Sequence, residues 1–420
     1  MQILHFSAYD TGAGAASAAY QLHQSLNHEG HSSRMVVRNK SSSDPSVQSA
    51  PFGRLNALNR IIGRVWPQKL AKGVYTFNAN GLTGLERRGL VSLEAQAVDI
   101  ICLHWINNLL TARDIKYIYD HYQRHIVWTL MDQEPVTGGC HYSFDCDGFE
   151  KQCGNCPQLV TSHSKDRSHV TWRSKFENLS GLPIVFVAPT NWLAQRIQKS
   201  SLFRNHQVEI IPLAIDTTVF RPFDQSASRN LLHLPQNKKI VFFGARYLFE
   251  ERKGMRYLFR ALEHLANMLA EAGRDRLELS DVHLLVVGNG LGELSLPFSH
   301  TAIPHLNDNI SLALAYQASD VFVCPSVEDA GPMMIPESML CGTPVVAFNT
   351  GGAPDLITTM KNGYLASYKN SEDLAKGVYS VLTRDSASNM RADARTVALK
   401  HSPAQVVQSY SRLFQSLRAS

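Results

Sequence analysis

Short, mostly apolar runs recur along the whole chain, and segments with helical spacing of apolar and polar positions separate them. Runs this short and this continuous predict strands that are buried on both faces of a sheet. The expected strands are 3–8, 98–105, 125–130, 184–189, 239–243, 282–290, 321–324 and 344–348. Helices are expected between them, for example at 112–122, 192–200 and 311–319. Strands that alternate with helices in this way indicate an α/β, doubly wound fold built on parallel sheets.

The chain is long enough for two such sheets. Its 420 residues exceed what one compact core normally holds, so two domains are expected. The polar run 224–239 predicts a linker, which places the boundary near Phe223 and gives domains over 1–223 and 224–402. The final segment, 403–420, has the amphipathic spacing of a helix from Pro403 to Leu417.

Composition and charge exclude several classes of protein. Hydrophobic residues make up 44% of the chain and charges are scattered evenly, which is typical of a folded globular protein. The formal net charge of +5 suits anionic substrates or a lipid surface, but it is too small for a dedicated nucleic-acid binder, so no nucleic-acid partner is expected. No run of 18 apolar residues occurs, and the first residues begin a strand instead of a signal peptide. We therefore expect a cytoplasmic protein whose seven cysteines are mostly reduced.

The most cationic part of the first half is Arg54–Lys72. Its apolar residues share one face of a helix, with Arg60 and Arg64 on the opposite face. Such a helix suits peripheral contact with the inner face of a membrane, or with a lipid-linked acceptor. It equally suits a helix that packs on the core and exposes its arginines to solvent, and the sequence leaves both interpretations open.

The stretch Val321–Ile357 carries the densest set of chemical signals. A buried strand leads into a Pro-Ser turn, the acidic pair Glu328-Asp329, a Gly-Pro corner and a short helix that carries Glu337. Pro336 fits a helix only in its first turn, so the free amides of the helix are expected near 331–334. A helix N-terminus flanked by two carboxylates suits a phosphate that carries a polyhydroxylated group.

Together these features resemble the C-terminal signature of retaining family-4 glycosyltransferases of the GT-B fold. That signature has a Pro-Ser pair, an acid, seven residues, Glu, and then GTPVV and a Gly pair. Seven residues separate Asp329 from Glu337, whereas Glu328 lies one place too far, and 342–346 and 351–352 supply the remainder. The resemblance implies two Rossmann-like domains that face each other across a cleft. The first would bind the acceptor, the second would bind a nucleotide sugar, and the helix 403–420 would cross back to the first.

The resemblance also implies roles for residues around the sugar. Glu337 would accept hydrogen bonds from the ribose hydroxyls, because a carboxylate can accept from two neighbouring O–H groups. Asp329 would hold hydroxyls of the transferred sugar and take part in catalysis. The backbone around Gly331, Pro332 and Met333 would line the same pocket.

The diphosphate would contact cations. Arg246 and Lys253 match the family's arginine and its "KG" pair, and Arg252 competes with Arg246 for the first role. Cations and a helix N-terminus can stabilise the departing nucleotide, so no cofactor is expected to be required for catalysis.

Gly14, in a small-residue loop after the first strand, would face the donor diphosphate and the acceptor. Alternatively, the Gly-x-Gly turn that contains Gly14 binds no ligand and only permits tight packing of the backbone.

On the acceptor side, His104 and Asp132 follow two expected strands. The family's T-x-H-D pattern is altered here, because Met131 stands where the donor-contacting histidine is expected. Asp132 is a candidate to orient the acceptor or to stabilise a cationic sugar, and either His104 or His141 could compensate for the missing histidine. A solitary histidine is also commonly a structural residue.

An insert at 137–159 contains Cys140, Cys146, Cys153 and Cys156. Four closely spaced cysteines in a reducing compartment predict a structural zinc ion or another metal, or free structural thiols, while disulfides are disfavoured there. Similar inserts occur in the surface-polysaccharide branch of the resembled family. A closed four-thiolate site has no open coordination position and would not be catalytic.

We therefore expect a retaining, hexosyltransferase-type enzyme. It would move a sugar from a UDP- or GDP-sugar to a glycan or lipid-linked glycan in lipopolysaccharide or exopolysaccharide biosynthesis. Two alternatives are an epimerase of nucleotide sugars on the same fold and a catalytically degenerate nucleotide-sugar-binding protein, which Met131 favours. A dinucleotide oxidoreductase is disfavoured because the first loop lacks a full G-x-G-x-x-G.

Overall fold

A computed structural model of the chain describes residues 1–12, 14–52, 85, 97–271, 277–290, 295–331, 333–384 and 387–419. The contacts within it divide the chain into two compact units. Unit 1 comprises Met1–Ala214 and Pro403–Ser420, and unit 2 comprises Ile215–Ser402. The segment Arg54–Lys72, for which the sequence suggests an amphipathic helix, lies outside the described residues.

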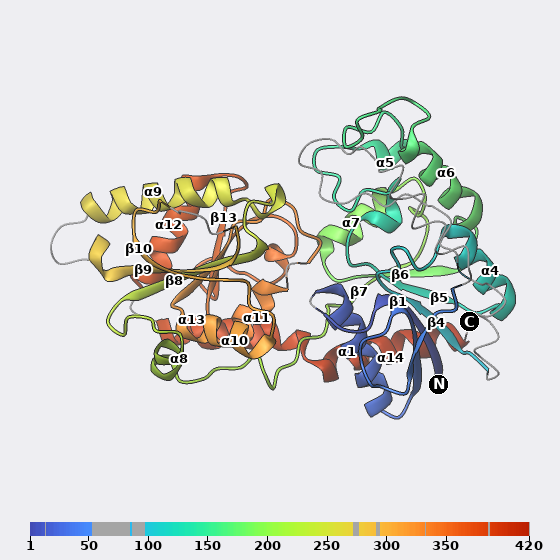
Figure 1. Ribbon diagram of the computed structural model, residues 1–420, viewed down its shortest axis with the longest axis horizontal. Helices are drawn as coiled ribbons and strands as arrows, with labels where there is room; N and C mark the ends of the chain where they lie inside the picture. The colour runs from blue at the N-terminus through green and yellow to red at the C-terminus, as the bar shows by residue number, and fades with distance from the viewer. Residues whose placement is uncertain are drawn as a thin grey trace. The chain divides into compact units, whose positions relative to one another are not determined.

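Unit 1 is built on a parallel sheet of seven strands in the order β3-β2-β1-β4-β5-β6-β7 (Figure 1). Its strands are β1 (Gln2–Tyr9), β2 (Ser32–Asn39), β3 (Val47–Ser49), β4 (Ile100–Leu103), β5 (Ile126–Thr129), β6 (Ile184–Ala188) and β7 (Val208–Ile210). Every residue of β4, β5 and β6 is buried, which explains their continuous apolar runs. The strand order reverses between β1 and β4, and open parallel sheets bind ligands beside such a reversal, at the carboxyl ends of the strands.

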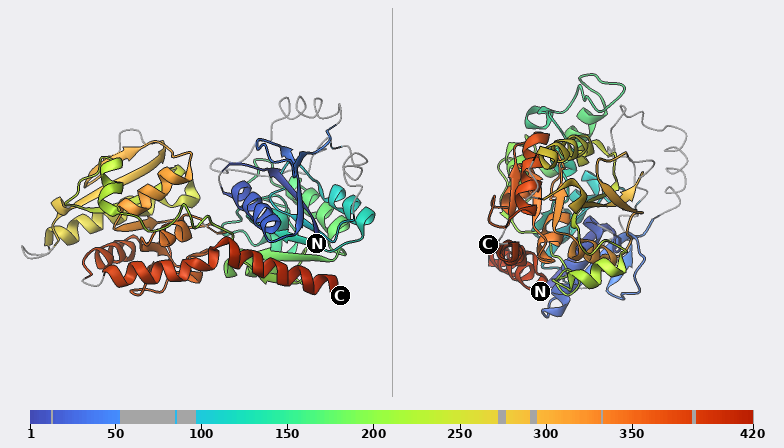
Figure 2. Two further views of the ribbon diagram at one scale, coloured as in Figure 1. Left: turned by 90° about the horizontal axis from the view of Figure 1, so that it is seen from below. Right: turned by 90° about the vertical axis from the view of Figure 1, so that its left-hand side faces the viewer.

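The helices of unit 1 cover this sheet. They are α1 (Ala15–His28), α4 (Ala112–Tyr122), η1 (Glu134–Val136), α5 (Gly148–Lys151), α6 (Arg167–Leu179), α7 (Asn191–Lys199) and α14 (Pro403–Ala419). The last of these, α14, lies beside α1 and buries Val407 and Phe414 in one core with Ile3 and Val127 (Figure 2). The Tyr410 hydroxyl lies 2.7 Å from Thr129 Oγ1 at the end of β5. The C-terminal segment is therefore an integral part of unit 1.

Unit 2 has a parallel sheet of six strands in the order β10-β9-β8-β11-β12-β13. The strands are β8 (Lys239–Tyr247), β9 (Val282–Asn289), β10 (Ser299–Ile303), β11 (Val321–Cys324), β12 (Val345–Phe348) and β13 (Gly363–Ala366). The helices are α8 (Gln225–Leu231), η2 (Glu251–Lys253), α9 (Met255–Glu271), η3 (Leu279–Asp281), α10 (Asn309–Ala318), α11 (Met334–Leu340), η4 (Ala353–Asp355), α12 (Ser371–Leu382), α13 (Ala387–Ala398) and η5 (Leu399–His401).

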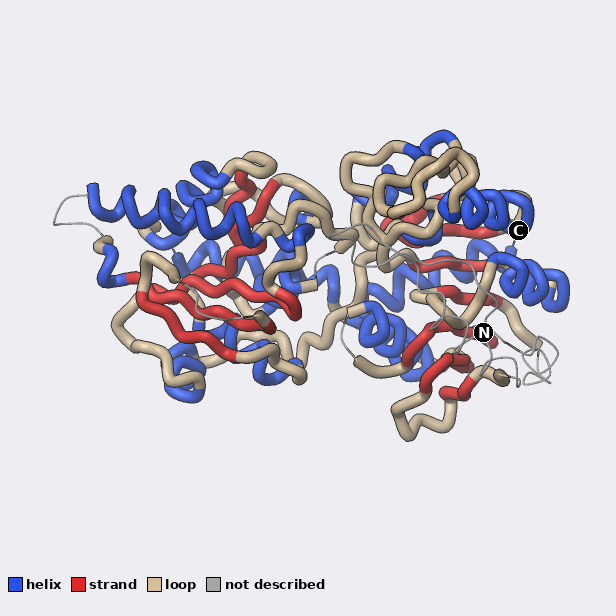
Figure 3. The backbone as a smooth tube through the Cα atoms, turned by 45° about the horizontal axis from the view of Figure 1, so that its top comes forward, coloured by secondary structure: helices blue, strands red, loops and turns tan. Residues whose placement is uncertain are grey.

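Two apolar cores sandwich this second sheet. Helices α9 and α12 bury residues such as Leu262 and Val378 against one face, while α10, α11 and α13 bury Tyr316, Met339 and Ala394 against the other. Figures 1 and 3 show the strands lying between these two helical layers. The strand order reverses between β8 and β11, so this unit too has a predicted ligand-binding edge.

The structure corrects the expected linker. The boundary between the units falls at Ala214/Ile215, before the expected position near Phe223, because Ile215 and Phe220 are buried in the core of unit 2. The run 224–239 is also not free of helix. Asp224 caps α8 by accepting from the Ala227 amide at 2.7 Å, and Arg229 pairs with Asp320 at 2.8 Å. The polar residues that made this segment resemble a linker therefore include the helix cap Asp224 and the ion-paired Arg229.

Proline suits the first position of a helix, but only the three-residue turn η4 forms around Pro354. No helix in the described part of the chain is both long enough and apolar enough to cross a membrane.

Candidate functional site

The loops that follow β8 and β11 pack directly on each other at the reversal point of the second sheet. Gly254, immediately after η2, has a φ of +70°, and a Cβ at this position would lie 1.9 Å from the Pro325 carbonyl oxygen. The Val327 amide donates to the Arg252 carbonyl at 2.8 Å. Only glycine allows the two loops to come this close. Their packing brings the basic residues after β8 next to the acidic residues after β11.

Asp329 is the centre of the charged cluster formed there. Its Oδ2 lies 2.9 Å from Arg252 Nη1 and 2.8 Å from Lys253 Nζ. Burial alone would raise the pKa of Asp329, but the Lys253 ammonium and the Arg252 guanidinium outweigh it and hold the pKa below its usual value. Glu250 pairs with the same guanidinium. The cluster therefore contains two basic and two acidic side chains.

Glu337 lies in the first turn of α11 and is in a different electrostatic state. Its Oε2 accepts from the hydroxyl of the fully buried Tyr316 at 3.2 Å. Burial raises the pKa of Glu337 to about 7, and this hydrogen bond only partly offsets the effect. A ligand that donates hydrogen bonds to this carboxyl group would therefore favour its ionised form.

The structure separates the two arginines that compete for the diphosphate role. Arg246 is exposed, with its guanidinium 5.7 Å from the centre of the Tyr247 ring, whereas Arg252 is part of the Asp329 cluster. Around the corner of α11, the Gly331 amide donates to Asp329 Oδ1 at 3.4 Å, and the Met333 carbonyl accepts from the Glu337 amide. Pro332 lies outside the described residues.

The matching edge of unit 1 carries Gly14 and Asp132. Gly14 precedes α1 with a φ of +65°, a conformation that favours glycine, and is exposed. Asp132 is buried in the loop after β5, and the Glu134 amide donates to its Oδ1 at 2.8 Å. Two side chains donate to its Oδ2, namely His141 Nδ1 at 2.6 Å and Trp105 Nε1 at 3.1 Å. This carboxylate is fully hydrogen-bonded.

His141 and Asp132 shift each other's pKa. Burial would raise the pKa of Asp132, but His141 and the hydrogen bonds lower it below its usual value. Burial would likewise lower the pKa of His141, yet Asp132 raises it above its usual value. The contact with Asp132 therefore favours a proton on His141 Nδ1 and the ionised form of the Asp132 carboxylate. Nε2 of His141 lies 2.9 Å from Asn107 Nδ2.

His104 does not share this arrangement. It is 2% exposed and its Nε2 lies 2.8 Å from His5 Nδ1 in the interior of unit 1. Burial, together with nearby His23, lowers the pKa of His104 to about 3, so this imidazole is neutral. The structure therefore places His104 inside the unit and not at a surface that an acceptor could reach.

The environment of Met131 is apolar. Met131 packs against a small apolar cluster that includes Ala19 and Met35, so the residue at the family's histidine position supports the core. Two other side chains contact Asp132 instead, namely His141, which the sequence indicates as a candidate to compensate, and Trp105, which it does not. The only sequence signal for Trp105 is that it directly follows His104 in the chain.

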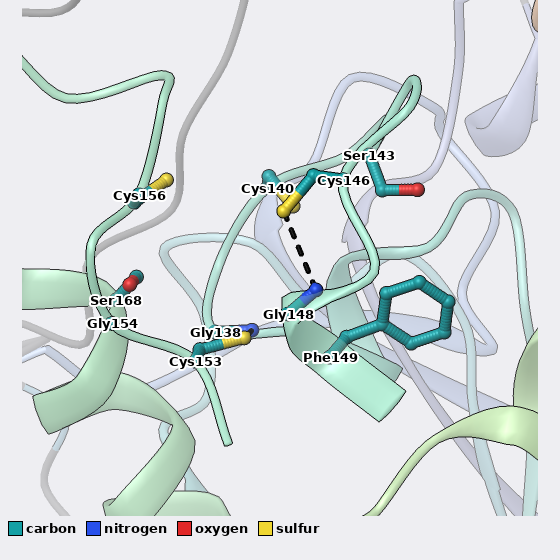
Figure 4. Close-up of a pocket in the computed structure, with 10 residues that line it drawn as sticks. All are labelled: Gly138, Cys140, Ser143, Cys146, Gly148, Phe149, Cys153, Gly154, Cys156 and Ser168. Carbon is teal, nitrogen blue, oxygen red and sulfur yellow. Dashed lines mark hydrogen bonds between the residues drawn. The ribbon is translucent and has the colours of Figure 1, made fainter. Parts of the chain in front are cut away.

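The four cysteines of the insert line one pocket (Figure 4). The pocket holds about 310 Å³ of space, which includes the part open to solvent. All four cysteines are free thiols. Within the described ranges, no three His, Cys, Asp or Glu side chains are grouped so that they could hold a metal ion as they stand.

Comparison with known proteins bears on unit 2. Residues 237–384, which include Lys253, Asp329 and Glu337, match the family described as "Glycosyl transferases group 1". The charged cluster and the Glu337–Tyr316 pair therefore both lie inside the segment that matches this family.

Two relatives and one solved structure extend the comparison. The chain is 29% identical over 218 residues to the D-inositol 3-phosphate glycosyltransferase of Mycolicibacterium smegmatis, and the match covers 51% of this chain and 49% of that protein. The chain thus spans about half the length of that relative. It is 23% identical over 440 residues to WcaC of Escherichia coli (strain K12), named for colanic acid biosynthesis, covering 99% of this chain and 100% of that protein. A structure of Anabaena HepE in complex with UDP and glucose matches with a TM-score of 0.64 and 15% identity, covering 99% of this chain and 100% of that chain.

These likenesses confirm the fold expected from the sequence. The chain has the GT-B fold, with two Rossmann-like units built on parallel sheets of seven and six strands. Its likeness to solved structures such as that of HepE agrees with this fold.

Proposed function

We propose that the protein is a retaining glycosyltransferase that takes a sugar from a nucleoside-diphosphate sugar and transfers it to a glycan or a lipid-linked glycan. The observation that carries the proposal is the cluster of Arg252, Lys253 and Asp329 at the reversal point of the second sheet, in the segment that matches the group 1 glycosyltransferases and also contains Glu337. The names of two similar proteins support it, because HepE is described with UDP and glucose and WcaC is named for colanic acid biosynthesis.

The ion pairs of the cluster would rearrange when the donor binds. Both cations are paired with carboxylates before binding, so the cluster contributes little net charge. A diphosphate would compete with Asp329 for Lys253 and Arg252 and would release the Asp329 carboxylate. The released carboxylate could then accept hydrogen bonds from the sugar hydroxyls, while Glu337 accepts from the ribose.

The reaction that follows needs no protein nucleophile. The bond from the anomeric carbon to the diphosphate oxygen breaks, and the acceptor hydroxyl oxygen bonds to that carbon on the same face. The departing phosphate oxygen takes the acceptor proton. Arg252 and Lys253 stabilise the charge that develops on the leaving group. Asp132, held ionised by His141, would orient the acceptor or stabilise the cationic sugar.

We place the reaction in the cytoplasm. A lipid-linked acceptor would be reached at the inner face of a membrane, and a free glycan acceptor would need no membrane contact.

A panel of nucleotide sugars tests the proposal. The melting temperature of the full chain is measured with UDP-, GDP- and ADP-hexoses, and ligand at ~100 times its Kd should stabilise the native state by about 2.7 kcal/mol. Glu337→Ala should abolish the shift, whereas the matched control Glu263→Ala, at an exposed position on α9, should keep it. If no donor shifts the melting temperature of the wild-type protein, the donor site is wrongly assigned.

Turnover assays then separate the alternatives. Release of nucleoside diphosphate that depends on an acceptor, with the anomeric configuration retained by NMR, supports the proposal. Conversion of the sugar without an acceptor would indicate an epimerase. Donor binding with neither transfer nor hydrolysis would indicate the degenerate binding protein that Met131 favours.

A further inference from the structure

The cysteine-bearing segment of unit 1 is long and has little regular structure. Between the end of η1 at Val136 and the start of α6 at Arg167, only the four-residue helix α5 forms. Phe149 and Leu159 are its buried large apolar side chains, which is a small core for a segment of this length. A long segment with so small a core needs an additional interaction to stabilise its conformation, and a bound metal ion can provide one.

The backbone of this segment is arranged around the sulfur atoms. The Gly138 amide donates to Cys153 Sγ at 3.2 Å, and the Gly148 amide donates to Cys146 Sγ at 3.4 Å (Figure 4). A Cβ at Gly138 would lie 2.7 Å from Cys153 Cβ, so glycine is needed for the chain to approach this cysteine. Amide donors aimed at sulfur favour the thiolate, which is the form that binds metal.

The four thiols line one pocket. Four cysteine thiolates are a common tetrahedral ligand set for structural zinc, and a bound divalent ion deprotonates the thiols that coordinate it.

We propose that Cys140, Cys146, Cys153 and Cys156 bind one structural zinc ion. On binding, the four S–H groups release four protons and the four thiolates bind Zn²⁺ with tetrahedral geometry. The thiols line the pocket without meeting as a ligand group, so their side chains turn inwards when the ion binds. Four thiolates leave no open position on the ion, so its role is to hold the segment in place.

The position of Cys140 connects this site to Asp132. Cys140 directly precedes His141, which donates to Asp132 at 2.6 Å, and the Cys140 carbonyl accepts from the Thr137 hydroxyl at 2.8 Å. Holding Cys140 by the metal would hold His141 against Asp132. This consequence rests on the proposed function, whereas the zinc site itself does not.

The metal content of the purified full chain tests the proposal. After purification under reducing conditions and incubation with zinc followed by desalting, we expect about one zinc per chain. Cys153→Ala and Cys156→Ala should each reduce zinc to below about a tenth of an equivalent. Cys102→Ala is the matched control, because this buried thiol of β4 lies outside the pocket and its loss should leave the zinc content unchanged.

A second measurement covers the case in which the cysteine variants fail to fold. Zinc is removed from the wild-type protein with a chelator and then returned, and the melting temperature is followed. We expect it to fall on removal and to recover with zinc but not with magnesium. Cobalt in place of zinc should give a thiolate charge-transfer band and the visible absorption of a tetrahedral site.

Three results would overturn the assignment. These are less than about a tenth of an equivalent of zinc in the reconstituted wild-type protein, iron with inorganic sulfide in its place, or disulfides among the four cysteines in the reduced preparation. Because these readouts involve no sugar transfer, failure of the zinc site and failure of the proposed function are distinguishable.

Discussion

Nδ1 of His141 lies 2.6 Å from Oδ2 of Asp132, although nine positions separate the two residues in the chain. In the resembled glycosyltransferases the histidine directly precedes the aspartate, and here Met131 takes that position and packs in the core. A histidine from the cysteine-bearing insert therefore contacts the carboxylate.

The first prediction concerns this pair. Asp132 is kept ionised by His141, so its pKa lies below the usual value and rises when His141 is removed. A carboxylate whose pKa is depressed loses its charge only as the pH falls through that pKa. We therefore expect His141→Ala to lower kcat/KM by about 10²-fold near neutral pH and to move the acidic limb of the pH profile to higher pH. The control His121→Ala changes an exposed histidine of α4 and should change neither. An unmoved acidic limb would show that His141 does not set the charge of Asp132.

The second prediction distinguishes the arginines. Because Arg252 is in the Asp329 cluster and Arg246 is exposed, Arg252→Ala and Lys253→Ala should weaken nucleoside-diphosphate binding by about 10-fold or more, or about 1.4 kcal/mol. Arg246→Ala should have a smaller effect, and Arg256→Ala, at an exposed arginine of α9, should have none. Calorimetric titration with UDP and GDP measures this. A larger loss for Arg246 than for Arg252 would restore the assignment that the family pattern favours.

The third prediction follows from the raised pKa of Glu337. A hydroxyl donor favours the ionised carboxylate, so donor affinity should increase as the pH rises from 6 to 8, through the pKa of about 7. Glu337→Gln should weaken binding at pH 8 and flatten this dependence. Isothermal titration at several pH values provides the test, and equal slopes for the two proteins would count against a contact between Glu337 and the ribose.

The same residue has an effect on stability with a defined sign. The folded-state pKa is raised above the value of an unfolded chain, so the stability linked to protonation is present below about pH 4.5 and is lost as the pH rises through about 7. Without ligand, Glu337→Gln should therefore raise the melting temperature relative to wild type more at pH 8 than at pH 5.

The fourth prediction concerns Gly254. A methyl group there would meet the Pro325 carbonyl at 1.9 Å with φ at +70°, so the two loops would have to separate. Gly254→Ala should cost roughly 2 kcal/mol or more, lowering the melting temperature by several degrees, and should also weaken donor binding. Gly181→Ala is the matched control, because nothing lies within 4 Å of its Cβ position and its φ is not positive. Normal donor binding by Gly254→Ala would show that the contact between the loops does not position the cations.

Many of the strands and helices could be predicted because each depends on the pattern of apolar residues within a few neighbouring positions. The expected strand 321–324 and the helix 112–122 have those bounds in the structure, and the helix expected at 192–200 is observed at Asn191–Lys199. Thr190 supplies its cap, since its hydroxyl accepts from the Leu193 amide at 3.2 Å. Such signals are contained within a few neighbouring residues.

What the sequence could not decide depends on contacts between distant segments. Arg246 lies near the end of β8 and Arg252 follows the strand, and only the packing of Gly254 on Pro325 places Arg252 against Asp329. Likewise, the pairing of His141 with Asp132 depends on how the insert folds back, and the helix α8 depends on the ion pair between Arg229 and Asp320. Each of these requires knowing which loops meet.

The Tyr410 hydroxyl reaches Thr129 from the last helix of the chain, and Val407 and Phe414 complete the core around Ile3 and Val127. During synthesis on the ribosome, the amino-terminal sheet therefore emerges long before the helix that covers part of it. It reaches its final state only after α14 has emerged as well, and until then part of its apolar surface stays uncovered.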